Sequence, residues 1–232
     1  MSSVPGNLHH VRERIVRACA AAGRPVQAVT LLAVSKTFGA DAVREAAAAG
    51  QTAFGENYVQ EALAKIAALA DLRSNLQWHL IGPLQSNKTR AVAEAFDWVH
   101  SVDRLKTAQR LSEQRPPGMP PLQVCLQVNI SAESSKSGLP ADEVQAVAQA
   151  VAALPGLRLR GLMAVPEPAT DLVAQRAPHR ALHALLDRLN ASGLALDTLS
   201  MGMSADLEAA ITEGATLVRV GTAIFGGRTA KI

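Results

Sequence analysis

The sequence predicts a closed (β/α)₈ TIM barrel preceded by an extra helix, and three observations support this α/β fold class. Short apolar runs alternate with helix-like segments along the chain, which favours parallel strands. Eight such runs occur, and eight strand–helix units in 232 residues match the usual size of this barrel. No linker or change of composition divides the chain, so we expect residues 1–232 to form one domain.

The extra helix at the N-terminus is predicted from apolar residues spaced as one face of a helix requires. These residues are Leu8, Val11, Ile15, Ala18 and Ala22. Gly23 and Pro25 follow them and favour the end of a helix at this point. The helix therefore precedes the first strand and is additional to the eight repeated units.

The eight predicted strands are short apolar runs bounded by Gly, Pro or polar residues. They cover residues 31–34, 52–54, 77–81, 98–101, 123–130, 158–162, 196–199 and 217–220. Helices are expected over residues 41–49, 103–114, 142–153 and 206–212, and three more end near residues 69, 95 and 189. An open, doubly wound sheet is the alternative, and it would bind ligands at a switch of strand order instead of between its first and last strands.

Composition and charge narrow the function classes. Lys and Arg number 23 against 20 Asp and Glu, and no basic run is long enough to indicate a nucleic-acid-binding surface. The two cysteines and six histidines show no metal-ligand spacing, so we expect no metal site and a reducing compartment. No segment resembles a membrane span or a signal peptide, and we therefore expect a cytoplasmic protein without membrane contact.

The most informative position is Lys36, at the end of the first predicted strand. In a closed barrel the first strand is a neighbour of the last, and working residues lie at the carboxyl ends of the strands. The loops at residues 200–204 and at Gly221-Thr222 follow the last two strands, and they are rich in Gly, Ser and Thr, which suits phosphate. A lysine amine facing a phosphate site fits an aldehyde that carries phosphate, and pyridoxal 5'-phosphate (PLP) is the leading candidate.

Arg219 would shape the chemistry of such a cofactor. An arginine is always protonated, and beside the pyridine nitrogen of PLP it would disfavour the pyridinium form and weaken the cofactor as an electron sink. The alternative is an arginine paired with a carboxylate such as Glu213 or Asp206. Two interpretations remain for His79, which is either a hydrogen-bonded core residue or a residue that lines the pocket. Lys136 is either a solvated loop residue or a second amine at the barrel mouth.

Seven ordered motifs resemble the pyridoxal phosphate homeostasis protein family, and together they span nearly the whole chain. The first contains Lys36 and reads Leu32-Ala33-Val34-Ser35-Lys36-Thr37. The others cover residues 54–61, 78–88, 128–131 with 135–138, 160–163, 199–204 and 218–222. The resemblance implies a barrel like the cofactor domain of alanine racemase, with PLP bound covalently through a Schiff base to Lys36.

The resemblance also implies roles for individual positions. It places the phosphate at Ser200, Ser204, Gly221 and Thr222, the pyridine ring nitrogen at Arg219, and one side of the ring at Asn57. We further expect His79, Met163 and Met201 to contact the cofactor, because each lies in or after a predicted strand. Phe38 stands where some members carry a basic residue, and Lys231 is the only lysine of the C-terminal tail, so the resemblance does not support a role for a basic mouth or tail in cofactor exchange.

Two functions follow from the resemblance. The first is a protein that buffers and carries PLP and so maintains vitamin B6 and amino-acid homeostasis, without established turnover and with apo PLP-dependent enzymes as candidate partners. The second is a PLP-dependent racemase, which needs a second base, commonly a tyrosine from a partner domain. The only tyrosine is Tyr58, and the chain ends soon after Gly221, so we favour the carrier. We also expect a monomer, because a barrel covers its own sheet and no stretch of the sequence presents a spare apolar helix face.

Overall fold

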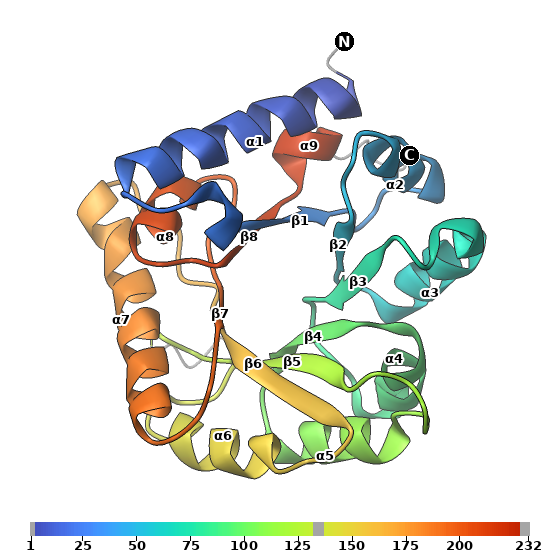
Figure 1. The fold of residues 1–232 in the computed structure, drawn as a ribbon, viewed down its shortest axis with the longest axis vertical. Coiled ribbons are helices and arrows are strands. Elements are labelled where there is room, and N and C mark those ends of the chain that lie inside the picture. Colours follow the sequence, from blue (N-terminus) through green and yellow to red (C-terminus); the bar gives the residue numbers. More distant parts are fainter. Residues whose placement is uncertain (1–2, 132–136, 228–232) are drawn as a thin grey trace.

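In the computed structural model, which describes residues 3–131 and 137–227, each strand pairs in parallel with the next, and the last pairs with the first. The strands are β1 (Thr30–Val34), β2 (Ala53–Glu56), β3 (Gln77–Leu80), β4 (Trp98–Val102), β5 (Leu122–Gln127), β6 (Leu157–Met163), β7 (Thr198–Ser200) and β8 (Leu217–Val220). Figure 1 shows the resulting closed barrel. The predicted (β/α)₈ fold is therefore confirmed, and the open sheet is excluded.

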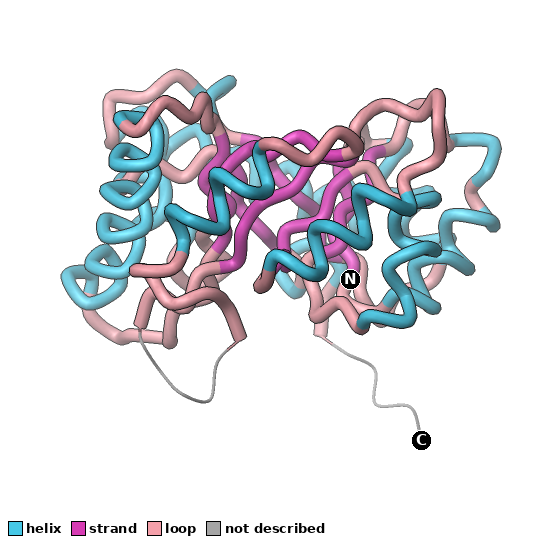
Figure 2. The backbone as a smooth tube through the Cα atoms, turned by 90° about the horizontal axis from the view of Figure 1, so that it is seen from below, coloured by secondary structure: helices cyan, strands magenta, loops and turns pink. Residues whose placement is uncertain are grey.

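The helices alternate with the strands as expected and flank the sheet from outside (Figure 2). They are α1 (Val4–Ala21), α2 (Ala40–Ala48), α3 (Val59–Ala68), α4 (Thr89–Ala95), α5 (Leu105–Gln114), α6 (Val144–Ala152), α7 (Leu172–Ala191), α8 (Leu207–Thr212) and α9 (Thr222–Phe225). The apolar faces of these helices and the outward side chains of the strands form one large core cluster. Within the described ranges, no helix has the length and apolar character needed to cross a membrane.

Most strand bounds differ from the sequence prediction by one or two residues, and the differences at β5 and β7 have a clear cause. β5 ends at Gln127 instead of residue 130, because Val128 leaves the regular ladder and forms an isolated bridge with Leu139. β7 is a short strand at Thr198–Ser200, displaced towards the C-terminus of the predicted run 196–199. An apolar run shows which residues are buried, but the pairing partner decides where the ladder stops.

The extra helix α1 lies against the final part of the barrel, next to α8 and α9 (Figure 1). Its N-terminus is capped by Ser3, whose hydroxyl accepts a hydrogen bond from the Gly6 amide at 3.3 Å. The apolar face of α1 is buried, with Leu8 fully inaccessible to solvent. This helix therefore holds the segment that includes β7, β8 and the loops after them.

Candidate functional site

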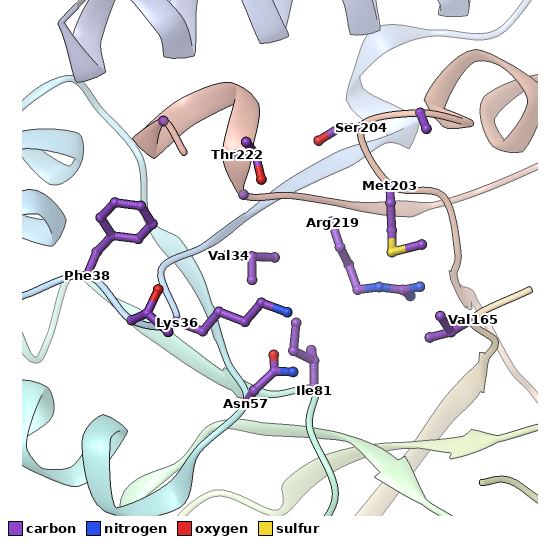
Figure 3. Close-up of a pocket in the computed structure, with 14 residues that line it drawn as sticks. Val34, Lys36, Phe38, Asn57, Ile81, Val165, Met203, Ser204, Arg219 and Thr222 are labelled. Carbon is purple, nitrogen blue, oxygen red and sulfur yellow. The ribbon is translucent and has the colours of Figure 1, made fainter. Parts of the chain in front are cut away.

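A cavity of about 420 Å³ opens at the carboxyl ends of the strands, where barrel enzymes keep their ligand sites. Of the residues predicted for the site, six line this cavity: Lys36, Asn57, Ser204, Arg219, Gly221 and Thr222. They come from the ends of β1, β2, β7 and β8, so the closed sheet brings together segments from both ends of the chain. Figure 3 shows their arrangement.

Lys36 supplies the amine of the pocket. Its side chain extends into the cavity between Asn57 and Thr222 (Figure 3), and among the described residues its Nζ has no hydrogen-bond or ion-pair partner. The chain turns sharply after it, because Thr37 has a φ of 70°, a left-handed value that is rare for a β-branched residue. The turn directs the backbone out of the barrel and leaves the lysine at its mouth.

A buried ionic group, which we call the Lys65 cluster, lies behind this turn and comprises Ser35, Thr37, Glu56, Glu61 and Lys65. The Nζ of Lys65 is 2.7 Å from Oε1 of both Glu56 and Glu61 and donates to the carbonyl of Ser35 at 2.7 Å. Glu56 also accepts from the Ser35 hydroxyl at 2.6 Å, and Glu61 accepts from the Thr37 amide at 2.6 Å. Hydrogen bonds within the Lys65 cluster therefore hold Ser35 and Thr37, the residues on both sides of Lys36.

Ser204 and Thr222 form the opposite side of the pocket with Gly221. A Cβ atom at position 221 would lie 3.1 Å from the Val34 carbonyl oxygen, so glycine lets the end of β8 approach β1 closely. Thr222 begins α9, and the first amides of a helix have no partner within it. Hydroxyl and amide donors are thus collected on one side of the cavity, an arrangement that suits an anion.

The helix α1 holds both of these loops. Arg14 donates to the Ser204 carbonyl at 3.0 Å and pairs with Glu208 at 2.9 Å. Asn7 donates to the carbonyl of Ile224, in α9, at 2.8 Å. The helix that the barrel repeat does not require therefore positions the side of the cavity that carries Ser204 and Thr222.

The loop between β7 and α8 is also fixed from within. Asp206 accepts from the Met203 amide at 2.7 Å and lies 2.9 Å from Nε2 of the buried His179. Burial raises the pKa of the Asp206 carboxyl, but the hydrogen bonds from His179 and Met203 outweigh it, and the pKa is lowered overall. Gly202 has a φ of 89°, and a Cβ there would meet the Cβ of Ala210 at 2.5 Å, so glycine is required at this bend.

Arg219 lies at the base of the cavity and is only 5% exposed. Its guanidinium donates to the carbonyl and hydroxyl of Ser200 at 2.6 and 2.8 Å and to the carbonyl of Ala164 at 2.8 Å. Burial lowers its pKa to about 10, which still leaves it protonated at neutral pH. These hydrogen bonds use three of its five N–H groups, and the other two have no partner in the described part of the chain.

The two carboxylates considered as partners of Arg219 bind elsewhere. Glu213 pairs with Arg176 and Arg180 on α7, and Asp206 pairs with His179. The alternative interpretation of Arg219 as one half of an ion pair is therefore wrong. The direct contacts of its guanidinium are backbone and hydroxyl oxygens, and the Asp206 carboxylate favours its charge from a distance without an ion pair.

Comparison with known proteins places these features in a family. The sequence profile of the family described as alanine racemase, N-terminal domain, matches residues 7–229. A pyridoxal phosphate homeostasis protein from Pseudomonas aeruginosa is 64% identical over 228 residues, which are 98% of this chain and 97% of that protein. This chain belongs to the pyridoxal phosphate homeostasis protein family.

Two further comparisons agree. A pyridoxal phosphate homeostasis protein from Escherichia coli is 52% identical over 229 residues, which are 98% of this chain and of that protein. PipY from Synechococcus elongatus, solved with PLP bound, superimposes with a TM-score of 0.85 at 38% identity, covering 97% of this chain and 100% of that one. This member of the pyridoxal phosphate homeostasis protein family is therefore similar to its solved relative over the entire barrel.

Four residues expected at the site do not line the cavity in this family member. Ser200 is fully buried beneath it and contacts Arg219, and His79 lies deeper still, where it bonds to His100. Met163 and Met201 are also buried, at 1% and 0% exposure. Lys136 and Lys231 lie outside the described residues. Strand position identified these side chains as internal but gave no measure of their depth in the barrel.

Other lining residues were not predicted from the sequence. They are Val34, Thr37, Phe38, Ile81, Val165, Met203, Ala205 and Gly226. Most of them follow strand ends within one or two residues of a predicted position, which is the signal that would have identified them. Val165 follows β6 in a Pro-rich loop, where the sequence shows no periodicity.

The residues present fit PLP. Lys36 offers an amine, Ser204 and Thr222 offer donors for a phosphate, and Arg219 offers two N–H groups at the base. Oδ1 of Asn57 is buried at the cavity wall without a partner, as expected of a group that awaits a ligand. Within the described ranges, no group of three His, Cys, Asp or Glu side chains could hold a metal ion.

Proposed function

We propose that this protein binds PLP covalently and reversibly through Lys36 and carries it without robust catalysis, so that it buffers the PLP supply of the cell. The observation that carries the proposal is the amine of Lys36, which has no partner among the described residues and lies in one cavity with Ser204, Thr222 and Arg219. The relatives from Pseudomonas aeruginosa and Escherichia coli are named pyridoxal phosphate homeostasis proteins, and PipY was solved with PLP bound.

The site residues take separate roles in this proposal. Ser204, Thr222 and the amides after Gly221 bind the phosphate, and Asn57 contacts one side of the pyridine ring. Arg219 donates to the ring nitrogen and, because it stays protonated, keeps that nitrogen unprotonated. When bound, PLP supplies an aldehyde that combines reversibly with amines.

The composition of the cavity favours a carrier over a racemase. Among the described residues that line it, Lys36 is the only basic side chain besides Arg219, and none is His, Tyr, Cys, Asp or Glu. Tyr58 is 54% exposed and lines a neighbouring hollow with Pro83 and Lys88. A second base on the opposite side of the ring, which racemisation requires, is therefore missing from the described lining.

The carrier proposal also specifies a compartment, an oligomeric state and a class of partners. We propose a cytoplasmic protein that acts as a monomer and whose partners are apo-enzymes that need PLP. Both of its cysteines are buried and free, as is usual for proteins of a reducing compartment. The residues 1–232 would act in this role as one domain.

Transfer of PLP to an apo-enzyme tests the function. The PLP-loaded protein is mixed with an apo-aminotransferase, with and without a trap that consumes free PLP, and recovery of aminotransferase activity is followed. We expect recovery in the presence of the trap, and little recovery with Lys36→Ala. Sustained conversion of an amino acid by the purified protein, at about 1 s⁻¹ or faster, would replace the carrier with an enzyme.

A further inference from the structure

A buried polar chain runs through the barrel below Arg219. The hydroxyl of Ser200 bonds to Arg219 at 2.8 Å and to Nδ1 of His100 at 2.8 Å, and Nε2 of His100 lies 2.9 Å from Nδ1 of His79. We call His79, His100 and Ser200 the histidine column. All three are 0–1% exposed, whereas barrel interiors are usually filled with branched apolar side chains.

Arg219 sets the direction of every hydrogen bond in the histidine column. Its guanidinium only donates, so the Ser200 oxygen must accept from it, and the Ser200 hydrogen is left for Nδ1 of His100. His100 then carries its hydrogen on Nε2 and donates it to Nδ1 of His79. In the opposite direction both partners of the Ser200 hydroxyl would be donors, and its hydrogen would have no acceptor among the described residues. Nε2 of His79 is without a hydrogen-bond partner there in either direction, so it does not decide between them.

Both histidines of the column are neutral. Burial lowers the pKa of His79 to about 3. Burial, His79 and the charge of Arg219 together lower the pKa of His100 well below 6.5. A neutral His100 has one donor and one acceptor, which is what its position between Ser200 and His79 requires.

The lower end of the column is packed against aromatic and charged groups. The ring of His79 stacks on Trp98 with centroids 5.3 Å apart and planes 9° apart. The guanidinium of Arg160 lies 4.9 Å from the Trp98 ring and pairs with Asp197 at 2.7 Å. These contacts fix the plane of His79 and, through the hydrogen bonds, the rotamer of His100.

We propose that His79 and His100 are positioning residues that hold the Ser200 lone pairs, and through them the guanidinium of Arg219, in the orientation needed to meet the ring nitrogen of PLP. The cofactor part rests on the proposed function, whereas the orientation of Arg219 is a property of the chain alone. Without an acceptor at His100, the Ser200 hydroxyl is free to rotate. The hydroxyl hydrogen can then point towards Arg219 and block the lone pair that accepts from it. In that orientation the guanidinium loses one of its three hydrogen bonds.

Matched substitutions at position 100 separate this role from simple packing. His100→Leu removes both ring nitrogens, whereas His100→Asn keeps an acceptor close to the place of Nδ1. Val99→Ala is the control, because Val99 is buried on the same strand but belongs to the large core cluster formed by the helices and the outward side chains of the strands. Val99→Ala should lower stability without changing any hydrogen bond of the histidine column.

The first measurement uses the protein without PLP. Nitrogen-15 spectra of the histidine rings at pH 7 should show His79 and His100 neutral with the hydrogen on Nε2. Hydrogen exchange at the Arg219 guanidinium should be faster in His100→Leu by roughly 2–12-fold, the value of one ordinary hydrogen bond, and nearly unchanged in His100→Asn and Val99→Ala. A hydrogen on Nδ1 of His100, or equal exchange in all four proteins, would overturn the proposal.

The second measurement uses PLP and an analogue in which C–H replaces the ring nitrogen. The wild type should prefer PLP, and His100→Leu should reduce the ratio of the two dissociation constants by roughly 2–12-fold, while His100→Asn and Val99→Ala keep it. An unchanged ratio in His100→Leu, with preference for PLP intact, would refute the positioning role. A wild type that binds neither compound would refute the proposed function instead, and the exchange rates of Arg219 would still decide the inference.

Discussion

The Nζ atom of Lys65 lies 2.7 Å from the carbonyl oxygen of Ser35, the residue that directly precedes Lys36. Lys65, which is 5% exposed, thus supports the backbone that presents Lys36. The amine of Lys65 is bound by two carboxylates and a carbonyl, whereas the amine of Lys36 has no partner among the described residues. The two amines have opposite surroundings. Lys65 is enclosed by Glu56 and Glu61, whereas the described residues that line the cavity around Lys36 include neither Asp nor Glu.

Removing the buried amine should destabilise the barrel. Lys65→Met leaves Glu56 buried with its main partner lost, and we expect the free energy of unfolding to fall by about 3 kcal/mol in urea titrations. Lys106→Met, at an exposed position on α5, should change it by less than about 0.5 kcal/mol. If Lys65→Met proves as stable as the wild type, the Lys65 cluster contributes no net stabilisation.

The double variant Lys65→Met with Glu56→Gln tests the cause of that loss. Burial raises the pKa of Glu56, and the ion pair with Lys65 offsets part of this effect. A neutral Gln at position 56 removes the unpaired carboxyl, so the double variant should recover part of the stability lost by Lys65→Met. A larger loss in the double variant would show that the carboxyl is stabilised by groups other than Lys65.

The sequence predicted the strands well because strands of a parallel barrel are buried on both faces and form continuous apolar runs. It also predicted that Lys36 and Arg219 would share a site, because the ends of the first and last strands meet when a barrel closes. Both inferences need only the order of the strands. Neither needs the depth of a side chain within the barrel.

The depth of a side chain within the barrel and the contacts between separate elements could not be predicted from the sequence. Ser200 was expected to bind phosphate, but its strand places it one layer below the cavity, where its hydroxyl meets Arg219 and His100. Nothing in the helical pattern around Lys65 distinguishes a buried lysine from a solvated one. Its burial depends on Glu56 at the end of β2 and on the Ser35 carbonyl after β1, and such contacts become visible only when the chain is folded.

Covalent attachment can be located directly. Reduction of the PLP-loaded protein with borohydride, followed by digestion and mass spectrometry, should place most of the label on Lys36. The reason is that its amine is free and within the cavity, whereas Lys65 is held by two carboxylates. Recovery of most of the label on Lys88 or Lys136 would contradict this assignment.

The phosphate site can be tested with a pair of substitutions at position 222. Thr222→Val removes the hydroxyl and keeps the shape, and we expect PLP affinity to fall by roughly 10–150-fold, the value of a hydrogen bond to a charged group. Thr222→Ser restores the hydroxyl and should bind nearly as the wild type does. If Val and Ser at position 222 bind PLP equally well, the phosphate does not contact this side chain.

The support that α1 gives to the pocket can be measured with two arginines of the same helix. Arg14→Leu removes the bond to the Ser204 carbonyl, and we expect PLP binding to weaken by roughly 2–12-fold as the loop loses one hydrogen bond. Arg17 is 68% exposed and lies 3.9 Å from Glu13, so Arg17→Leu should leave affinity unchanged. Equal affinities for both variants in a fluorescence titration would show that Arg14 does not support the loop.

The neutral histidines of the column predict how stability changes with pH. The unfolded chain takes up a proton on each histidine as pH falls below about 6.5, whereas folded His79 resists protonation until about pH 3. Its contribution to stability is therefore complete above pH 6.5 and is lost as pH falls towards 3. The slope approaches about 1.4 kcal/mol per pH unit for each such histidine.

Comparison of His79→Leu with the wild type isolates that contribution. Urea unfolding at pH 7.0 and 5.5 should show that the wild type loses about 1 kcal/mol more stability over this interval than His79→Leu does. Burial lowers the pKa of His79, and the cations Arg219 and Arg160 cannot stabilise a protonated ring. Asp197, the acidic group that lines the hollow beside His79, is paired with Arg160 at 2.7 Å. Val99→Ala should show the same loss as the wild type. An equal loss in His79→Leu would mean that His79 accepts a proton in the folded protein, and the histidine column would then be charged instead of neutral.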